Sequence, residues 1–203
     1  MATNIIPTKG NLISLKRSLA RAKLGFELLD RKRNVLMREM MKLIDESAQL
    51  QQDIGDTFSS AYRALQSANV TLGIEQIMIG VEPEEDGLSI SSRSVMGVEL
   101  PTTAQKEHSL KPLYSFGNTN SQLDRAYLSF NKVKLMAARL ASIDNSVYRL
   151  AVAIKKTQRR ANMLENINIP KFEENIRFIS GVLEEREREE FTRLKVIKKT
   201  KKS

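Results

Sequence analysis

Apolar residues recur in alternating steps of three and four along the first quarter of the chain, and this rhythm constrains the fold more than any other feature. The positions are Leu12, Leu15, Leu19, Ala22, Phe26, Leu29, Arg33, Leu36, Met40, Leu43, Ser47, Leu50 and Ile54, and eleven of these thirteen are apolar. A seven-residue repeat keeps one stripe on the same face of a helix, so two helices can wrap around each other. We call these positions the first seam, and they predict a long helix that needs a helical partner.

A second seam lies near the other end of the chain, at Met136, Leu140, Ile143, Val147, Leu150, Ile154, Thr157, Ala161 and Leu164. The two seams predict a mainly α fold, in which long N- and C-terminal helices form an antiparallel coiled coil around a small strand-containing insert. The expected divisions are an N-terminal helix over residues 1–69, an insert over 70–122 and a C-terminal helix over 123–203. Pro170 removes a backbone donor, so a kink or short break is expected near Asn168–Pro170.

The insert is rich in glycine and proline, and part of it alternates with a period of two, which is typical of strands and favours a β-hairpin. One face is expected to hold Leu88, Ile90, Met96, Val98 and Leu100. The other is expected to hold Ser89, Ser91, Arg93 and Glu99.

Two members of the first seam, Arg33 and Ser47, are polar. They are interpreted as edge positions, where the stem of the arginine lies along apolar surface and its head reaches water. The alternative is that they set the register of the two helices at some cost in stability.

Composition excludes several classes of protein. The chain has no cysteine, so it has neither a disulfide framework nor a Cys-ligated metal site. Residues 1–10 contain no apolar stretch typical of a secretory signal, and no apolar run approaches the roughly 20 residues of a membrane-spanning helix. We therefore expect a cytoplasmic protein, peripheral to a membrane at most.

Residues that could carry catalysis or bind a metal are scarce. His108 is the single histidine and lacks partner ligands, and no phosphate-binding or dinucleotide-binding glycine motif occurs. The carboxylates of residues 82–86 flank Pro83 and Gly87 in a predicted turn, where solvated acids are the better interpretation. We expect no catalytic residue, no cofactor and no metal.

The net charge of +9 is concentrated at the two ends of the chain. Residues 1–33 carry a net charge of +6, residues 191–203 also carry +6, and residues 70–120 carry −4. An antiparallel pair would bring the basic ends together, where they could meet an acidic protein, acidic lipid or nucleic acid. A solvated tail that keeps the chain in solution is the simpler interpretation.

Several segments resemble the D subunit of the V-type rotary ATPases, in the same order along the chain. Residues 7–40 are similar to the opening of that family, and residues 94–98 (SVMGV) resemble its short insert. The second half is more specific. It contains IKKTQRRANMLE at residues 154–165, IRFI at 176–179, and LEEREREE followed by TRLK within 183–195.

This resemblance implies a non-catalytic central rotor shaft that transmits torque between ATP hydrolysis or synthesis and proton or sodium transport. The implied partners are the catalytic and non-catalytic head subunits, the small F subunit of the rotor, and the funnel-shaped subunit that caps the membrane ring. Candidate contacts with these partners are Lys16, Arg17, Arg21, Lys23, Lys195, Lys198, Lys199, Val95 and Met96. The alternatives are a basic coiled-coil arm that binds nucleic acid and, with no constellation in its favour, an enzyme.

Overall fold

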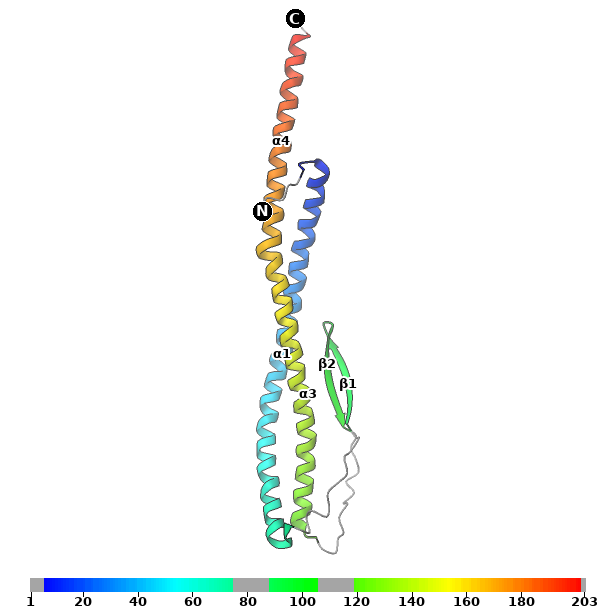
Figure 1. The fold of residues 1–203 in the computed structure, drawn as a ribbon, viewed down its shortest axis with the longest axis vertical. Coiled ribbons are helices and arrows are strands. Elements are labelled where there is room, and N and C mark those ends of the chain that lie inside the picture. Colours follow the sequence, from blue (N-terminus) through cyan, green and yellow to red (C-terminus); the bar gives the residue numbers. More distant parts are fainter. Residues whose placement is uncertain (1–5, 75–87, 106–118, 202–203) are drawn as a thin grey trace. The chain divides into compact units, whose positions relative to one another are not determined.

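The computed structural model describes residues 6–74, 88–105 and 119–201 (Figure 1). Its elements are helix α1 (Lys9–Leu72), strands β1 (Leu88–Val95) and β2 (Val98–Gln105), helix α3 (Ser121–Met163), a π-helical turn η2 (Leu164–Asn168) and helix α4 (Ile169–Thr200). The predicted fold class is confirmed, because two long stretches of helix flank a two-stranded antiparallel hairpin. The chain divides into two compact units, which are residues 1–34 with 155–203 (unit 1) and residues 35–154 (unit 2).

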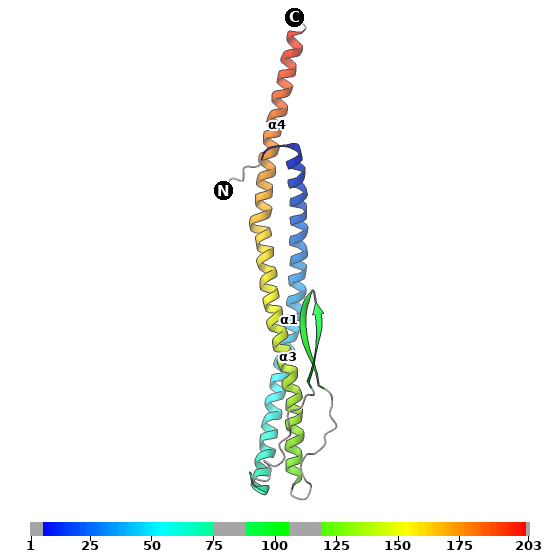
Figure 2. The same cartoon turned by 45° about the vertical axis from the view of Figure 1, so that its right-hand side comes forward.

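In unit 2, the second part of α1 runs antiparallel to α3, and the β-hairpin lies along both helices (Figure 2). Five buried residues form its core, contributed by α1, β2 and α3: Leu36, Leu43, Leu100, Ile143 and Leu150. Further toward the end of α1, Phe58 and Tyr62 contact Phe130 of α3 through edge-to-face rings at centroid distances of 6.4 and 5.4 Å. The sequence-predicted seams therefore meet side by side in this unit.

Burial follows both predicted seams closely. Every position of the first seam and every position of the second seam is buried or half-buried, and none is exposed. The same holds for the continuation along α4 at Phe172, Ile176, Ile179 and Leu183. Leu36 and Leu150 have no exposed surface at all. The heptad rhythm thus marks the contact between the helices.

The two polar members of the first seam make hydrogen bonds to the facing helix. In unit 1, Arg33 Nη1 donates to Gln158 Oε1 at 2.8 Å, and in unit 2 the buried Ser47 donates from Oγ to Asp144 Oδ1 at 3.3 Å. The edge interpretation was wrong for Ser47, because a residue at the edge of the stripe would face water. Each of the two side chains links the facing helices, which is the kind of contact that the register-setting alternative predicts.

The hairpin alternates differently from the sequence-based expectation. A two-residue turn joins the strands, so Val95 faces Val98 and even-numbered residues of β1 face odd-numbered residues of β2. Arg93 consequently shares a face with Leu100, whereas Ile90 lies opposite Thr103. The single face expected for Leu88, Ile90, Val98 and Leu100 was wrong, because the alternation was counted through the turn as though it were strand.

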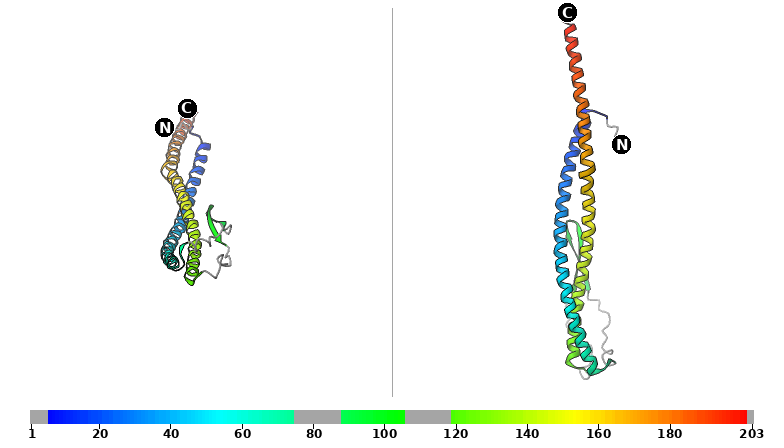
Figure 3. Two further views of the ribbon diagram at one scale, coloured as in Figure 1. Left: turned by 60° about the horizontal axis from the view of Figure 1, so that its bottom comes forward. Right: turned by 90° about the vertical axis from the view of Figure 1, so that its left-hand side faces the viewer.

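In unit 1, the start of α1 packs antiparallel to α4 (Figure 3). Lys9 forms an ion pair with Glu187 at 2.9 Å, and Lys23 forms another with Glu173 at 2.8 Å. Beyond Glu187, α4 continues as an exposed helix that no described segment covers. Near Asn168–Pro170, where a kink or short break is expected, the regular α-helix gives way to the π-turn η2. The π-turn η2 carries the helix past Pro170, which lies in the first turn of α4.

Candidate functional site

The β-hairpin is held to the helices of unit 2 from several directions. Leu100 enters the core with only 1% of its surface exposed. Arg93 Nη2 of β1 lies 2.6 Å from Glu39 Oε1 of α1, and Arg149 Nη1 of α3 donates to the carbonyl oxygen of Glu99 at 3.1 Å. Thr103 Oγ1 donates to the carbonyl oxygen of Ala138 at 3.2 Å. These contacts fix the hairpin to both α1 and α3.

The turn of the hairpin exposes an apolar side chain, that of Met96. Met96 has φ of 50° and Gly97 has φ of 75°, the pair of positive angles that a type I′ turn requires. A positive φ is unusual for methionine, and half of the Met96 surface is exposed. Val95, the other predicted contact in the insert, packs partly against the core. The two predicted contact residues therefore differ in accessibility. Met96 is available to a partner, whereas Val95 mainly anchors the turn.

A cleft of about 590 Å³ lies between the hairpin and the helices of unit 2. Its walls include Arg93 on β1, Glu46 on α1 and Arg139 on α3, and Arg139 forms an ion pair with Glu46. The hydroxyl groups of Ser142 and Ser146 donate to the carbonyl oxygen of Pro101 within the same region. These polar groups form hydrogen bonds and ion pairs with one another. The cleft is therefore better interpreted as the packing interface between the hairpin and the helices than as a ligand site.

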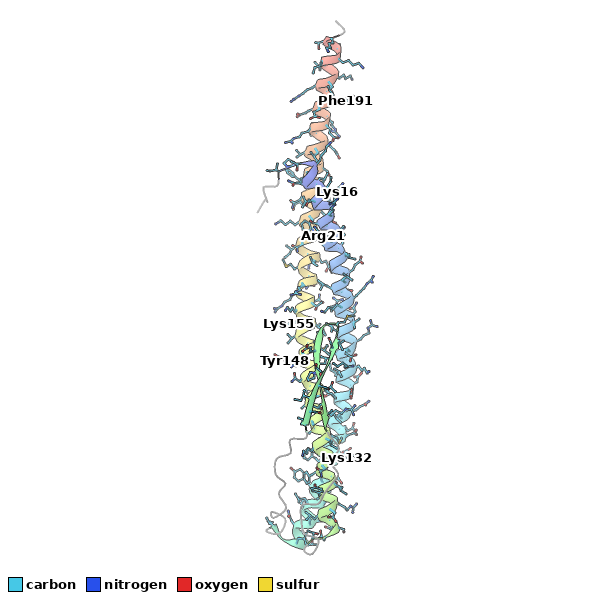
Figure 4. All side chains as sticks on the ribbon, turned by 90° about the vertical axis from the view of Figure 1, so that its right-hand side faces the viewer. Lys16, Arg21, Lys132, Tyr148, Lys155 and Phe191 are labelled. Atoms are coloured by element: carbon cyan, nitrogen blue, oxygen red, sulfur yellow. The ribbon has the colours of Figure 1, made fainter. Side chains whose placement is uncertain are left out.

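The basic residues predicted as contacts lie on unit 1, and all of them are exposed. Figure 4 shows Lys16 and Arg21 on the first part of α1, and Phe191 on α4 past the start of α1. Because Lys9 is level with Glu187, Lys195 lies about 12 Å farther along α4 at 1.5 Å per residue. Lys198 and Lys199 are farther still. Both basic stretches lie in unit 1, as expected for an antiparallel pair, and α4 carries the second stretch past the start of α1.

Lys23 has a second role within the unit. Its ammonium hydrogen-bonds to the carboxylate of Glu173 and, with its charge, lowers the pKa of that carboxyl group. At the other ion pair, the hydrogen bond and charge of Glu187 raise the pKa of Lys9. Both pairs are exposed, so salt screens them, and they help to align the helices more than they stabilise them.

The end of α4 also presents apolar side chains that composition alone does not reveal. Phe191, Leu194 and Ile197 are spaced by three residues and expose 69%, 66% and 56% of their surfaces. Basic residues alternate with them along the same turns. A helix end that is both apolar and basic, and that has no partner among the described residues, is a candidate surface for another protein.

A second apolar stripe, missed by the sequence analysis, lies on α1 in unit 2. Met37, Met41 and Ile44 are exposed, and their spacing of four and three places them on one face of the helix. Glu39 and Glu46, which adjoin the hairpin, lie about 200° around the helix from Met37 and Ile44. The stripe therefore faces away from the hairpin. The sequence contains a signal for this stripe, because each of its three residues directly follows a residue of the first seam.

No group of three or more His, Asp or Glu side chains that could hold a metal exists within residues 6–74, 88–105 and 119–201. His108 and the acidic residues within 82–86, for which a turn is expected, lie outside the described residues. Across the described part of the chain, no helix has a stretch long and apolar enough to cross a membrane.

These features define a class of protein, an antiparallel two-helix coiled coil with a docked hairpin, whose exposed surfaces are suited to contacts with other proteins. Comparison with known proteins identifies the family. The family model that describes the D subunit of ATP synthase matches residues 11–199, and the chain belongs to this family.

Several relatives match along nearly their whole length. The D subunit of the V-type ATP synthase of Thermotoga neapolitana is 47% identical over 198 residues, which cover 96% of this chain and 97% of the relative. The D subunit of the A-type ATP synthase of Pyrococcus furiosus is 38% identical over 198 residues, covering 95% and 92%. Its A-type counterpart from Thermococcus kodakarensis is 35% identical over 201 residues, covering 96% and 94%.

Proposed function

We propose that this chain is the central-stalk rotor subunit of a V-type or A-type ATP synthase. In this role it transmits torque between ATP hydrolysis or synthesis in the catalytic head and proton or sodium transport through the membrane ring. It is a non-catalytic subunit, and it lies on the cytoplasmic side as a peripheral part of the complex. The observation that carries the proposal is the pair of seams without an exposed member, found in a chain of the ATP synthase D-subunit family.

Mechanically, such seams suit a shaft. Relative sliding of the two helices would pull Leu36 and Leu150 out of the core of unit 2 and break the Arg33–Gln158 hydrogen bond in unit 1. Burial of a leucine is worth about 1.5–3 kcal/mol, so each slipped layer is costly. Interlocked helices can therefore carry load.

The free end of α4, with the basic residues of α1, is proposed to contact the catalytic and non-catalytic head subunits. Phe191 and Leu194 would enter an apolar ring, while Lys195 and its neighbours would meet acidic groups on that ring. The charge of unit 1 supports this division, because residues 191–203 carry six Lys or Arg and no acid.

The hairpin is proposed to contact the small F subunit of the rotor and the funnel-shaped subunit that caps the membrane ring. Met96 would supply the apolar contact at the turn, and the anchoring of Arg93 and Leu100 would pass the load to the helices. Replacing residues 85–99 with a linker would therefore disturb the helices as well, because it removes Val95 and Val98 from the core of unit 2.

Point substitutions provide the cleaner test. Phe191→Ser with Leu194→Ser should abolish binding to the purified head and leave binding to the F subunit intact. Met96→Asn keeps a residue that tolerates positive φ and should weaken binding to the F subunit alone. Val70→Ser, which changes a residue that is 87% exposed, is the matched control and should alter neither.

Binding of every partner by all variants would refute the assignment of the two ends. If the chain joins none of these subunits and instead binds nucleic acid with an affinity that falls steeply with salt, the nucleic-acid alternative is correct.

A further inference from the structure

The second seam contains one residue too many for an α-helix. Steps of three and four lead to Leu164, but the next half-buried apolar residue is Ile169, five positions later. The regular rhythm then resumes at Phe172, Ile176, Ile179 and Leu183. Five residues advance an α-helix by about 1.4 turns, so an unbroken α-helix would point Ile169 away from α1. Some device in the backbone must absorb the additional residue.

The π-turn η2 is that device. The backbone N–H of Ile169 donates to the carbonyl oxygen of Leu164, five residues earlier, so the turn holds one residue more than an α-helical turn. Pro170 follows directly and donates no backbone hydrogen bond. In an α-helix its ring would also clash with the carbonyl group four residues earlier, and the wider turn relieves that clash. The extra residue and the proline thus accommodate each other.

Specific contacts align the helices on both sides of the π-turn. Before it, Arg33 Nη1 donates to Gln158 Oε1 at 2.8 Å, and Gln158 Nε2 donates to Asn162 Oδ1 at 2.6 Å. After it, Lys23 and Glu173 form their ion pair at 2.8 Å. The alignment of α1 with its partner is therefore set above and below the turn.

The π-turn itself is packed lightly. Leu164 faces Gly25, where a Cβ atom built on the glycine would lie 3.7 Å from Leu164 Cδ1. On the outer side Glu165, Asn166 and Ile167 are exposed, and no residue of η2 is buried. Few apolar contacts around exposed backbone hydrogen bonds characterise segments that open locally at low free energy.

We propose that the π-turn Leu164–Asn168 is the point of flexure of unit 1. Here α4 changes its winding under load while the seam contacts on either side stay closed. The role of the π-turn as a torsional element in a rotor rests on the proposed function. Its flexure is a property of the isolated chain. Strain applied to α4 would be taken up by the hydrogen bonds of one turn instead of by separation of the helices.

Hydrogen exchange on the full-length protein tests the flexure. In the wild type, the amides of residues 165–169 should exchange at least about tenfold faster than those of residues 154–161. A variant that lacks Ile167 and carries Pro170→Ala restores steps of three and four throughout the seam. It should form a continuous α-helix and slow the exchange of this segment by at least about tenfold.

Two controls keep the test decisive. Deletion of the exposed Val152 shortens α3 by one residue where the seam is regular, so it should lower the melting temperature, whereas the Ile167 deletion should not. Gly25→Ala, which needs no rearrangement, places a methyl group in ordinary contact with Leu164 and should slow exchange about two- to fivefold.

Equal protection of residues 165–169 and 154–161 in the wild type would overturn the proposal, as would unchanged exchange in both the deletion variant and Gly25→Ala. Failure of the chain to join any ATP synthase subunit, with the exchange pattern as described, would refute the proposed function and leave the flexure standing.

Discussion

Leu150 is the position where the packing of unit 2 can be tested most directly. Its side chain has 0% exposure and belongs to the core with Leu36, Leu43, Leu100 and Ile143. Leu150→Ala removes three carbon atoms, which corresponds to about 2.4 kcal/mol at roughly 0.8 kcal/mol per buried methylene. Because Leu100 is held by the hairpin and the helices are held by their seams, the site cannot collapse fully. The remaining cavity brings the expected loss to about 3–4 kcal/mol.

The measurement is thermal and urea unfolding followed by helix-sensitive circular dichroism. A loss of about 3–4 kcal/mol should lower the Tm by roughly 6–15 °C for a chain of this size. Val152→Ala is the matched control, because it changes an aliphatic residue two positions away that is 51% exposed. It should remain within about 0.5 kcal/mol of the wild type. Equal losses for the two variants would show that the seam does not bury Leu150 against α1 and the hairpin.

Further predictions concern charge, register, the turn and pH. Leu43→Asp places an unpaired charge in the core of unit 2 and should unfold it, whereas Glu187→Ala should change the Tm little; similar melting curves would contradict the seam assignment. A double-mutant cycle of Arg33→Leu and Gln158→Leu should give a coupling of about 1–2 kcal/mol, and a coupling near zero would exclude a role in register. Gly97→Ala should destabilise the hairpin by about 1 kcal/mol, because an L-residue at positive φ is strained, and fast exchange confined to β1 and β2 would report it. The pKa of Glu173 is lowered in the folded state, so the pair with Lys23 stabilises above the ordinary value of 4.5 and loses its effect as the pH falls through the folded pKa. The Tm difference between wild type and Glu173→Gln should therefore vanish in acid and in high salt, and a difference that persists there would assign it to packing.

The helices could be predicted in detail because a coiled coil is specified by short-range periodicity. Every seam position from Leu12 to Ile54 is at least half-buried, and so is every one from Met136 to Leu164. The hairpin was less tractable, because strand register depends on where the turn falls. A turn at Met96 and Gly97 reverses the relation between the faces, which composition does not reveal. The seating of Leu100 between the helices depends on tertiary contacts that no local pattern encodes.

The environment of Pro170 shows a different limit. A proline in a helical pattern predicts a kink. That prediction does not take into account the one extra residue that precedes Pro170 in the seam. The step of five between Leu164 and Ile169 was the available signal for a π-turn. The contact candidates on α1 and α4 could be located by charge, whereas the exposed stripe at Met37, Met41 and Ile44 required knowledge of which side the hairpin covers.

The uncovered end of α4 has a thermodynamic consequence for any protein that binds it. Residues 188–200 extend an existing helix, so the cost of nucleation is already met, but their helicity relies on exposed pairs such as Arg193 with Glu189 and on lysines near the C-terminal dipole. Fraying of this helix end therefore competes with binding. Part of the binding free energy gained by contacts to Phe191 and Leu194 is offset by the cost of keeping these turns helical. Helix-favouring changes such as Thr192→Ala would raise affinity through slower dissociation. Thr192→Gly would bind roughly fivefold more weakly than Thr192→Ala, since glycine costs about 1 kcal/mol more than alanine in a helix. The helix propensity of these turns thus contributes to binding strength in addition to the contacts themselves.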